Sequence, residues 1–148
     1  MRISAKGRYA LAAVVSMARQ YNNGEHITVI SISENLGISK IYLEQVFSLL
    51  KRGKIVNSVK GAQGGYRLTR MPGQITVLDV LSAVEMSLFE KTEDTVFQKS
   101  PDIEKAMRSS VFDVLDKSMK NALSSVTLEE LVSEVEKNSD SNAMMFYI

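Results

Sequence analysis

The pattern that most constrains the fold is a pair of amphipathic segments, residues 29–36 and 41–52, with Gly37 between them. Apolar side chains recur in both segments at the spacing of one helix face, which predicts a short helix followed by a longer one. Ser39 is a residue type that caps helix N-termini, and Gly53 is typical of a helix end. Two helices of this kind, joined by a Gly-containing turn, predict a helix-turn-helix motif. The apolar stripe of the longer helix comprises Ile41, Leu43, Val46, Leu49 and Leu50.

The flanking segments add a third helix and a wing. Helical spacing over residues 9–21 predicts a helix before the motif, while residues 54–60 and 66–69 have the composition of two strands joined by a glycine-rich turn. Glycine lets such a turn sit close to a phosphate backbone, and we expect this of Gly61, Gly64 and Gly65. The basic residues around the hairpin are Lys51, Arg52, Lys54, Lys60, Arg67 and Arg70.

The second half predicts further helices around a weakly patterned loop, residues 86–100. Thr76 is placed to cap a fourth helix, and Pro101 opens a long one. Thr127 begins a capping-box sequence for a last helix that we expect to end at about Lys137. The predicted fold class is therefore mainly α with a small β-hairpin, a winged helix-turn-helix plus a long dimerisation helix.

The long helix carries more apolar surface than a domain of this size covers by itself. Its apolar side chains recur at threes and fours, so we expect the helix to pair with a second copy of the chain. The predicted dimerisation residues are Ile103, Met107, Val111, Val114, Leu115 and Met119.

The charge of the chain is divided unequally between its halves. Residues 1–73 contain eleven Lys or Arg and three Asp or Glu, a net charge of +8, whereas residues 74–148 contain seven and fourteen, a net charge of −7. A basic half is the electrostatic footprint of a phosphate-binding surface, and an acidic half suits a protein partner. We expect the first half to bind double-stranded DNA.

Other classes of protein find little support in the sequence. The chain has no cysteine, which excludes disulfides, thiolate metal sites and cysteine nucleophiles. His26 is the single histidine, and neither a phosphate loop nor a dinucleotide-binding glycine motif is present. No stretch is typical of a membrane span or a signal peptide. We therefore expect a cytoplasmic protein that is not an enzyme and needs no metal and no cofactor.

Three stretches resemble the IscR and CymR family of bacterial winged-helix repressors: MRISAKGRYA at the start, ISKIYLEQVF in the longer helix, and VKGAQGGYRL across the hairpin. The resemblance covers residues 1–85, and a later stretch, VTLEEL, is similar to the segment that follows the family's dimerisation helix. It implies a homodimeric repressor whose recognition helices enter successive major grooves, about 34 Å apart, of an imperfectly palindromic operator.

By position, the resemblance assigns base contacts to the start of the longer helix and a basic wing contact to Lys60. Basic side chains at the start of the first helix would anchor phosphates there, unless they form only a solvated helix end. The expected DNA-binding residues are Arg2, Lys6, Arg8, Ser39, Lys40, Tyr42, Glu44, Gln45, Lys51, Lys60, Gly61, Gly64 and Gly65.

Two of these residues have a second interpretation. Glu44 in a major groove would accept a hydrogen bond from a cytosine amino group, but Lys40 lies four residues before it, at the spacing of an intrahelical ion pair. Tyr42 is equally suited to packing half-buried against the core.

The family pattern breaks in the loop before the long helix. Members that sense iron-sulfur clusters carry three cysteines there, where this chain has Phe89, Glu90, Thr92, Glu93, Val96 and Phe97. The usual cluster cannot form. Glu90, Glu93 and Asp94 have the chemistry for a hard cation, although a solvated acidic loop is the favoured interpretation.

The C-terminal residues form an apolar pentapeptide, MMFYI, behind a polar stretch, residues 138–143. Apolar ends are captured by a groove or pack on the protein itself, so Met145, Phe146, Tyr147 and Ile148 are a predicted partner-binding tail. The cysteine-metabolism repressors of the family also lack cysteines and end in a similar FYI. The resemblance implies cysteine synthase (O-acetylserine thiol-lyase) as partner, with Ile148 in its active site.

We expect three functional regions: a DNA-binding domain over residues 1–73, a dimerisation and effector region over residues 74–137, and a tail over residues 138–148. Two alternatives stay open. One is a regulator of another stress or metabolic pathway that works without an iron-sulfur cluster. The other is a protein-interaction adaptor that kept the winged fold and lost DNA binding.

Overall fold

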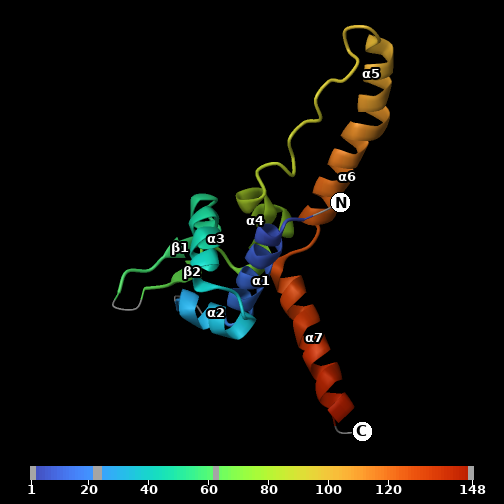
Figure 1. Cartoon of the computed structure of the whole chain (residues 1–148). Helices are drawn as coiled ribbons and strands as arrows, with labels where there is room; N and C mark the ends of the chain where they lie inside the picture. The colour runs from blue at the N-terminus through green and yellow to red at the C-terminus, as the bar shows by residue number, and fades with distance from the viewer. Residues whose placement is uncertain (1–2, 22–24, 62–63, 147–148) are drawn as a thin grey trace.

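The first half of the chain folds as a winged helix (Figure 1). The computed structural model describes residues 3–21, 25–61 and 64–146, with the last four described by their backbone alone. Elements of this half are α1 (Ala5–Arg19), α2 (Val29–Leu36), α3 (Lys40–Arg52), β1 (Val56–Ser58) and β2 (Tyr66–Leu68).

Local sequence signals set the limits of the helices. Thr28 caps α2 and Ser39 caps α3, each by accepting a hydrogen bond from a backbone N–H of the first turn. Gly37 ends α2 in the left-handed region, at φ 67°, where a residue without a side chain carries no steric penalty. The helix-turn-helix prediction is confirmed in these details.

The hairpin is shorter than predicted. Its strands pair antiparallel in the register Val56 to Leu68, whereas the sequence predicted strands over residues 54–60 and 66–69. Lys54 adopts φ 62°, outside the extended region, because the chain turns there directly from α3 into β1. Ile27 adds a single bridge to Tyr66, so β2 is paired on both sides.

The hydrophobic core joins both halves of the sequence. Helices α1 and α3 and strand β1 bury most of it, but Ile75, Val80 and Val84 belong to the same cluster, as does Leu128. The expected boundary after Gly73 therefore does not separate two hydrophobic cores. The division into three regions stays a proposal about function.

The second half adds α4 (Val77–Val84), which packs against α1 and α3, and further helices that extend away from the winged helix. After a 3₁₀ turn, η1 (Pro72–Gln74), and α4, the loop predicted for residues 86–100 runs to the start of a long helix. These elements are α4 (Val77–Val84), α5 (Pro101–Met107), η2 (Arg108–Phe112), α6 (Asp113–Ser124) and α7 (Leu128–Phe146). In Figure 1, α5 and α6 run in one direction from the winged helix and α7 runs in the other.

Two predictions about these helices need correction. The long helix is not uniformly α, because η2 is a π-type turn between α5 and α6. The prediction that the last helix ends near Lys137 is wrong, since α7 continues to Phe146. Asn, Ser and Asp over residues 138–142 are weak helix formers, but that stretch contains no Gly or Pro, and extending an existing helix is far easier than starting one.

Helix α7 is held against the winged helix at its first turns. Leu128 is fully buried, Leu131 and Val132 pack against the core, and Arg19 of α1 forms an ion pair with Glu136 at 3.1 Å. Within the described ranges, none of the helices combines the length and the apolar content that a membrane span requires.

Candidate nucleic-acid interface

Helix α3 turns one face to the core and the other to solvent. Its buried residues are Leu43, Val46, Phe47 and Leu50. Its exposed face contains Lys40, Ile41, Glu44, Gln45 and Ser48. Gln45 and Glu44, both predicted to contact bases, thus lie on the free face.

Ile41 departs from the prediction that it belongs to the apolar stripe facing the core. Its side chain is 71 % exposed. It lies at the start of α3, two residues before the buried Leu43, and that offset places it on the outer side of the helix.

Ser39 and Tyr42 are engaged within the protein. The Ser39 hydroxyl accepts a hydrogen bond from the backbone N–H of Tyr42 at 3.4 Å, as an N-cap does. The half-buried ring of Tyr42 packs edge-on against the ring of Tyr9, with centroids 5.1 Å apart. The packing role considered for Tyr42 is therefore present, and its contact with DNA stays a prediction.

Glu44 forms the ion pair that its spacing predicts. Its carboxylate lies 3.7 Å from the Lys40 ammonium, and both side chains are about half exposed. An exposed pair of this kind contributes only about 0.3–0.5 kcal/mol, so it does not lock the carboxylate in place. Both residues border an open hollow between α3 and the hairpin, opposite Gly65 and Tyr66, where Glu44 remains free to take another partner.

Aromatic packing and one glycine fix the hairpin beside α3. Tyr66 stacks on Phe47 of α3 with ring centroids 4.7 Å apart. Gly65 has φ 144°, and a Cβ atom there would lie 2.9 Å from the backbone oxygen of Ile27. Gly64 also has a positive φ, of 63°, whereas Gly61 has open space around it. The wing geometry thus needs glycine at positions 64 and 65 but not at 61.

The predicted basic residues differ in their exposure and in whether they have a partner within the protein. Lys6, Lys51 and Lys60 are exposed, and Arg8 is exposed while its guanidinium donates to the backbone oxygen of Ile3 at 2.7 Å. Arg2 lies outside the described residues. In the basic set around the hairpin, Arg70 donates instead to the Asp79 carboxylate at 3.2 Å, within the cap of α4.

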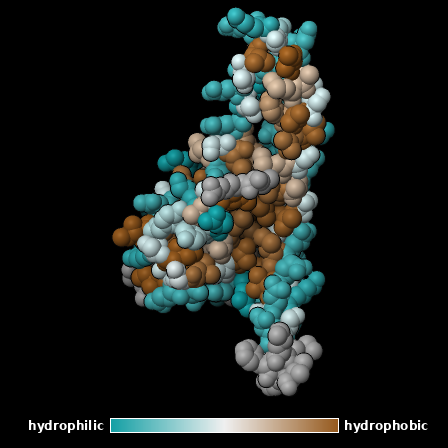
Figure 2. All heavy atoms as spheres, turned by 45° about the vertical axis from the view of Figure 1, so that its right-hand side comes forward, coloured by the Kyte–Doolittle hydropathy of each residue, from teal (hydrophilic) through white to brown (hydrophobic). Residues whose placement is uncertain are grey.

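The predicted dimerisation residues lie on the long helix with little covering them in the single chain. Ile103 is 56 % exposed and Leu115 is 62 % exposed, Val111 and Val114 are exposed as well, and Met107 and Met119 are half-buried. Figure 2 brings the right-hand side of Figure 1 forward, where α5 and α6 lie, and shows hydrophobic surface there.

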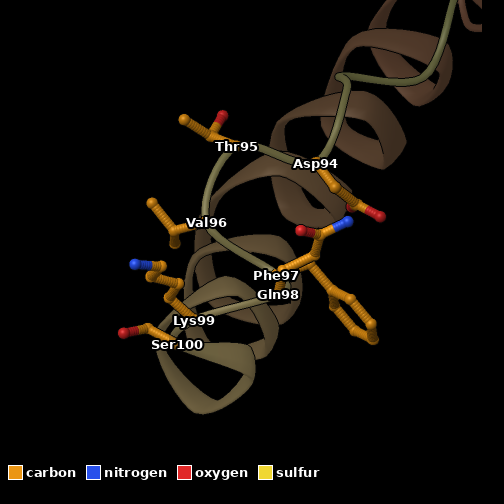
Figure 3. Close-up of a pocket in the computed structure, with 7 residues that line it drawn as sticks. All are labelled: Asp94, Thr95, Val96, Phe97, Gln98, Lys99 and Ser100. Carbon is orange, nitrogen blue, oxygen red and sulfur yellow. The ribbon is translucent and has the colours of Figure 1, made fainter.

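The loop before the long helix is held in place by a residue that the sequence analysis did not single out. Glu104, in the first turn of α5, is 2 % exposed, and its two carboxylate oxygens accept hydrogen bonds from the backbone N–H groups of Thr95 and Val96, at 3.0 and 3.2 Å. Arg108 donates to Asp94 and to the backbone oxygen of Thr92. The hollow in Figure 3 is lined by the consecutive residues 94–100 of this one loop.

The predicted C-terminal tail is described only in part. The backbone of Met145 and Phe146 is the last turn of α7, and Tyr147 and Ile148 lie outside the described residues. The predicted tail, residues 138–148, is therefore helical as far as Phe146.

Comparison with known proteins gives consistent matches over nearly the whole chain. The Rrf2 family, described as iron-dependent transcriptional regulators, matches residues 3–134. The HTH-type transcriptional regulator IscR of Xenorhabdus nematophila is 37 % identical over 136 residues, covering 92 % of this chain and 82 % of that protein. The HTH-type transcriptional regulator CymR of Bacillus subtilis is 35 % identical over 150 residues and covers all of both chains.

Solved structures show the same fold. The structure of CymR, the global cysteine regulator of B. subtilis, matches with a TM-score of 0.68 and 32 % identity over 90 % of this chain and 98 % of that one. IscR of T. potens matches with a TM-score of 0.71 and 33 % identity over 93 % and 90 %. These structural matches confirm the expected winged-helix fold class. The matched family and relatives are transcriptional regulators, which confirms the expectation of a regulator rather than an enzyme.

The iron named in the family's description does not fit the residues of this chain. It has no cysteine to bind a cluster. Among the described residues, no three His, Asp or Glu side chains are placed to share a metal ion, and Asp94 is paired with Arg108 at 2.7 Å.

Proposed function

Because the chain belongs to the Rrf2 family of transcriptional regulators, we propose that it represses transcription as a homodimer bound to a palindromic DNA operator. The observation that carries this proposal is the free face of α3, beside a wing with an exposed lysine, in a half of the chain with a net charge of +8. Side chains on a recognition helix read base edges, while lysines around it neutralise phosphates.

Within this interface, Glu44 and Lys60 have different roles. Glu44 selects a base by accepting from a cytosine amino group and by repelling the acceptors of guanine. Lys60 contacts a phosphate and so contributes equally to every sequence. Arg2, Lys6, Arg8, Lys40 and Lys51 add further phosphate contacts. The proposed set also includes Ser39, Tyr42 and Gln45 and the wing glycines Gly61, Gly64 and Gly65.

The dimer is the second part of the proposal. Exposed aliphatic side chains on α5 and α6 are covered by the same helix of a second copy, which sets two α3 helices at the spacing of successive major grooves. This pairing accounts for the surface that the long helix leaves uncovered in the single chain.

The test is DNA binding as a function of salt. Operators are selected from random DNA with the full-length protein, and fluorescence anisotropy is then measured between 50 and 300 mM KCl. We expect the logarithm of affinity to fall with the logarithm of salt by about 0.9 per neutralised phosphate. A flat response, or no selected sequence, would contradict DNA binding and favour the interaction adaptor.

Substitutions separate the two kinds of contact. Glu44→Ala should relax base preference in each half-site and keep much of the affinity, whereas Lys60→Ala should weaken all sequences alike and lower the salt slope by about 1. Lys99→Ala, an exposed lysine in the acidic half, is the matched control and should change neither. Equal loss of specificity in both interface variants would refute this division.

We further propose that the protein regulates cysteine metabolism and that its C-terminal tail binds cysteine synthase. The full-length match to CymR, the global cysteine regulator of B. subtilis, supports the pathway. The tail residues Met145 to Ile148 are apolar, and Ile148 with its carboxylate would occupy the enzyme's active site, coupling repression to O-acetylserine.

Isothermal titration with pyridoxal-phosphate-loaded cysteine synthase tests this second proposal. Binding by the full-length dimer should be lost on deletion of Phe146–Ile148 and reduced by added O-acetylserine. Deletion that leaves the affinity unchanged would show that the tail is structural, and it would leave the DNA-binding proposal unaffected.

A further inference from the structure

The side chain of Ile41 is exposed at a position where exposure needs a reason. Among the described residues of α1 to α4, it is the most exposed of the large aliphatic side chains, at 71 %. It packs against none of the core, although the sequence pattern placed it in the apolar stripe of α3. A single exposed aliphatic residue is unremarkable on most surfaces, so its neighbours decide its significance.

Those neighbours are the residues proposed to read bases. Ile41, Glu44, Gln45 and Ser48 border one open groove along the outer face of α3. Residues three, four and seven positions apart share one face of a helix, so Ile41 points to the same side as the other three. It also lies within the first turn of α3, and the N-terminal residues of a recognition helix are the ones that meet base edges.

The chemistry of the major groove supplies one apolar partner. Each base presents donors or acceptors there, and only thymine adds a methyl group, at C5. A branched aliphatic side chain has neither a donor nor an acceptor, so it cannot satisfy the polar edges of guanine, adenine or cytosine. Contact with a thymine methyl group removes apolar surface of both groups from water.

We infer that Ile41 is a specificity-determining residue that contacts the C5-methyl group of one thymine in each half-site of the operator. This inference rests on the proposed DNA-binding function and deepens it. Glu44, three residues further along the same face, then reads a base pair next to that thymine. Base preference at the two positions therefore has two independent origins, an apolar contact and a carboxylate acceptor.

The experiment removes the methyl group from the DNA and the side chain from the protein. In the selected operator, each thymine is replaced in turn, in both half-sites, by deoxyuridine, which keeps base pairing and lacks only the C5-methyl group. Affinities are measured for the wild-type dimer, Ile41→Ala and the control Met71→Ala, which removes an exposed side chain outside the α3 groove. Alanine favours helix, and Ile41 is not packed, so we expect the fold to be unchanged by circular dichroism.

At one thymine position the wild type and Met71→Ala should lose about fourfold in affinity per half-site on replacement, the effect of about one buried methyl group. Ile41→Ala should bind thymine and deoxyuridine equally there. A variant that keeps the wild-type loss at every thymine, or an operator without such a thymine, overturns the inference and leaves DNA binding standing. Failure to bind any operator would instead reject the proposed function together with it.

Discussion

At the scale of single residues, Glu104 shows how a carboxylate can organise a loop. Among the described residues it is the one buried charged side chain, and both of its oxygens accept hydrogen bonds from backbone N–H groups of the preceding loop. Hydrogen bonds from backbone donors to an ionised acceptor are stronger than neutral ones, and burial makes their loss costly. A side chain of α5 thus holds the loop at Thr95 and Val96, next to the ion pair of Arg108 with Asp94.

Replacing that acceptor should loosen the loop. In Glu104→Gln, the amide nitrogen has no lone pair to offer, so one of the two backbone N–H groups loses its partner, and we expect about 1–3 kcal/mol of destabilisation. Hydrogen exchange at Thr95 and Val96 should accelerate, while Glu93→Gln, an exposed carboxylate in the same loop, should change neither exchange nor the melting temperature. Unchanged protection at both amides would show that Glu104 does not hold the loop.

At the scale of elements, the wing depends on the close approach of β2 to the chain before α2. The N–H of Tyr66 donates to the oxygen of Ile27 at 2.9 Å, and the N–H of Ile27 donates back at 2.8 Å. Gly65 precedes this pair, and its φ of 144° together with the nearby Ile27 backbone leaves no room for a side chain. The bridge and the glycine therefore belong to one structural unit.

Gly65→Ala should disrupt this unit. The strain of that backbone angle and the contact with Ile27 together predict about 1–3 kcal/mol of destabilisation and weaker DNA binding through the displaced wing. Gly61→Ala is the matched control for stability, because a Cβ atom at position 61 meets open space within the protein, and its free energy of unfolding should be unchanged or slightly higher. Thermal unfolding compares the two variants, and anisotropy measures DNA binding by Gly65→Ala. Equal stability of the two variants would mean that the wing adapts without cost.

The sequence predicted these elements better than the contacts between them. Periodicity and caps located α2 to α4 closely, because the capping bonds of Ser39 and Thr76 are local. Helix α1 was located less well, since it begins at Ala5 and ends at Arg19, whereas the sequence predicted residues 9–21. The ion pair of Arg19 with Glu136 joins residues 117 positions apart, and no local pattern indicates it. Glu104 and Ile41 were missed for a related reason: burial of a carboxylate and exposure of an isoleucine are decided by what packs around them.

At the scale of the whole molecule, the uncovered surface of α5, η2 and α6 is the feature that a single chain does not explain. Ile103, Val111 and Leu115 follow one another at intervals of four or eight residues along the helix, and each is about half exposed or more. Burying an aliphatic side chain of this size contributes about 1.5–3 kcal/mol. A second copy of the chain explains this row of aliphatic side chains, because the same row on the copy would cover it. In a symmetric interface each of these residues is buried twice, once in each chain.

Leu115→Glu tests that explanation directly. The substitution removes an apolar side chain and places a charge at the proposed interface twice per dimer, so it should weaken association by about 3 kcal/mol or more, roughly 100-fold or more in Kd. Sedimentation velocity at micromolar protein should show a monomer for Leu115→Glu and a dimer for the wild type. Lys117→Glu introduces the same side chain two residues away, on the opposite side of α6, and should remain a dimer.

Because a monomer binds only one half-site, Leu115→Glu should also bind a full palindrome no better than an isolated half-site. A dimeric Leu115→Glu protein would place the interface on another surface.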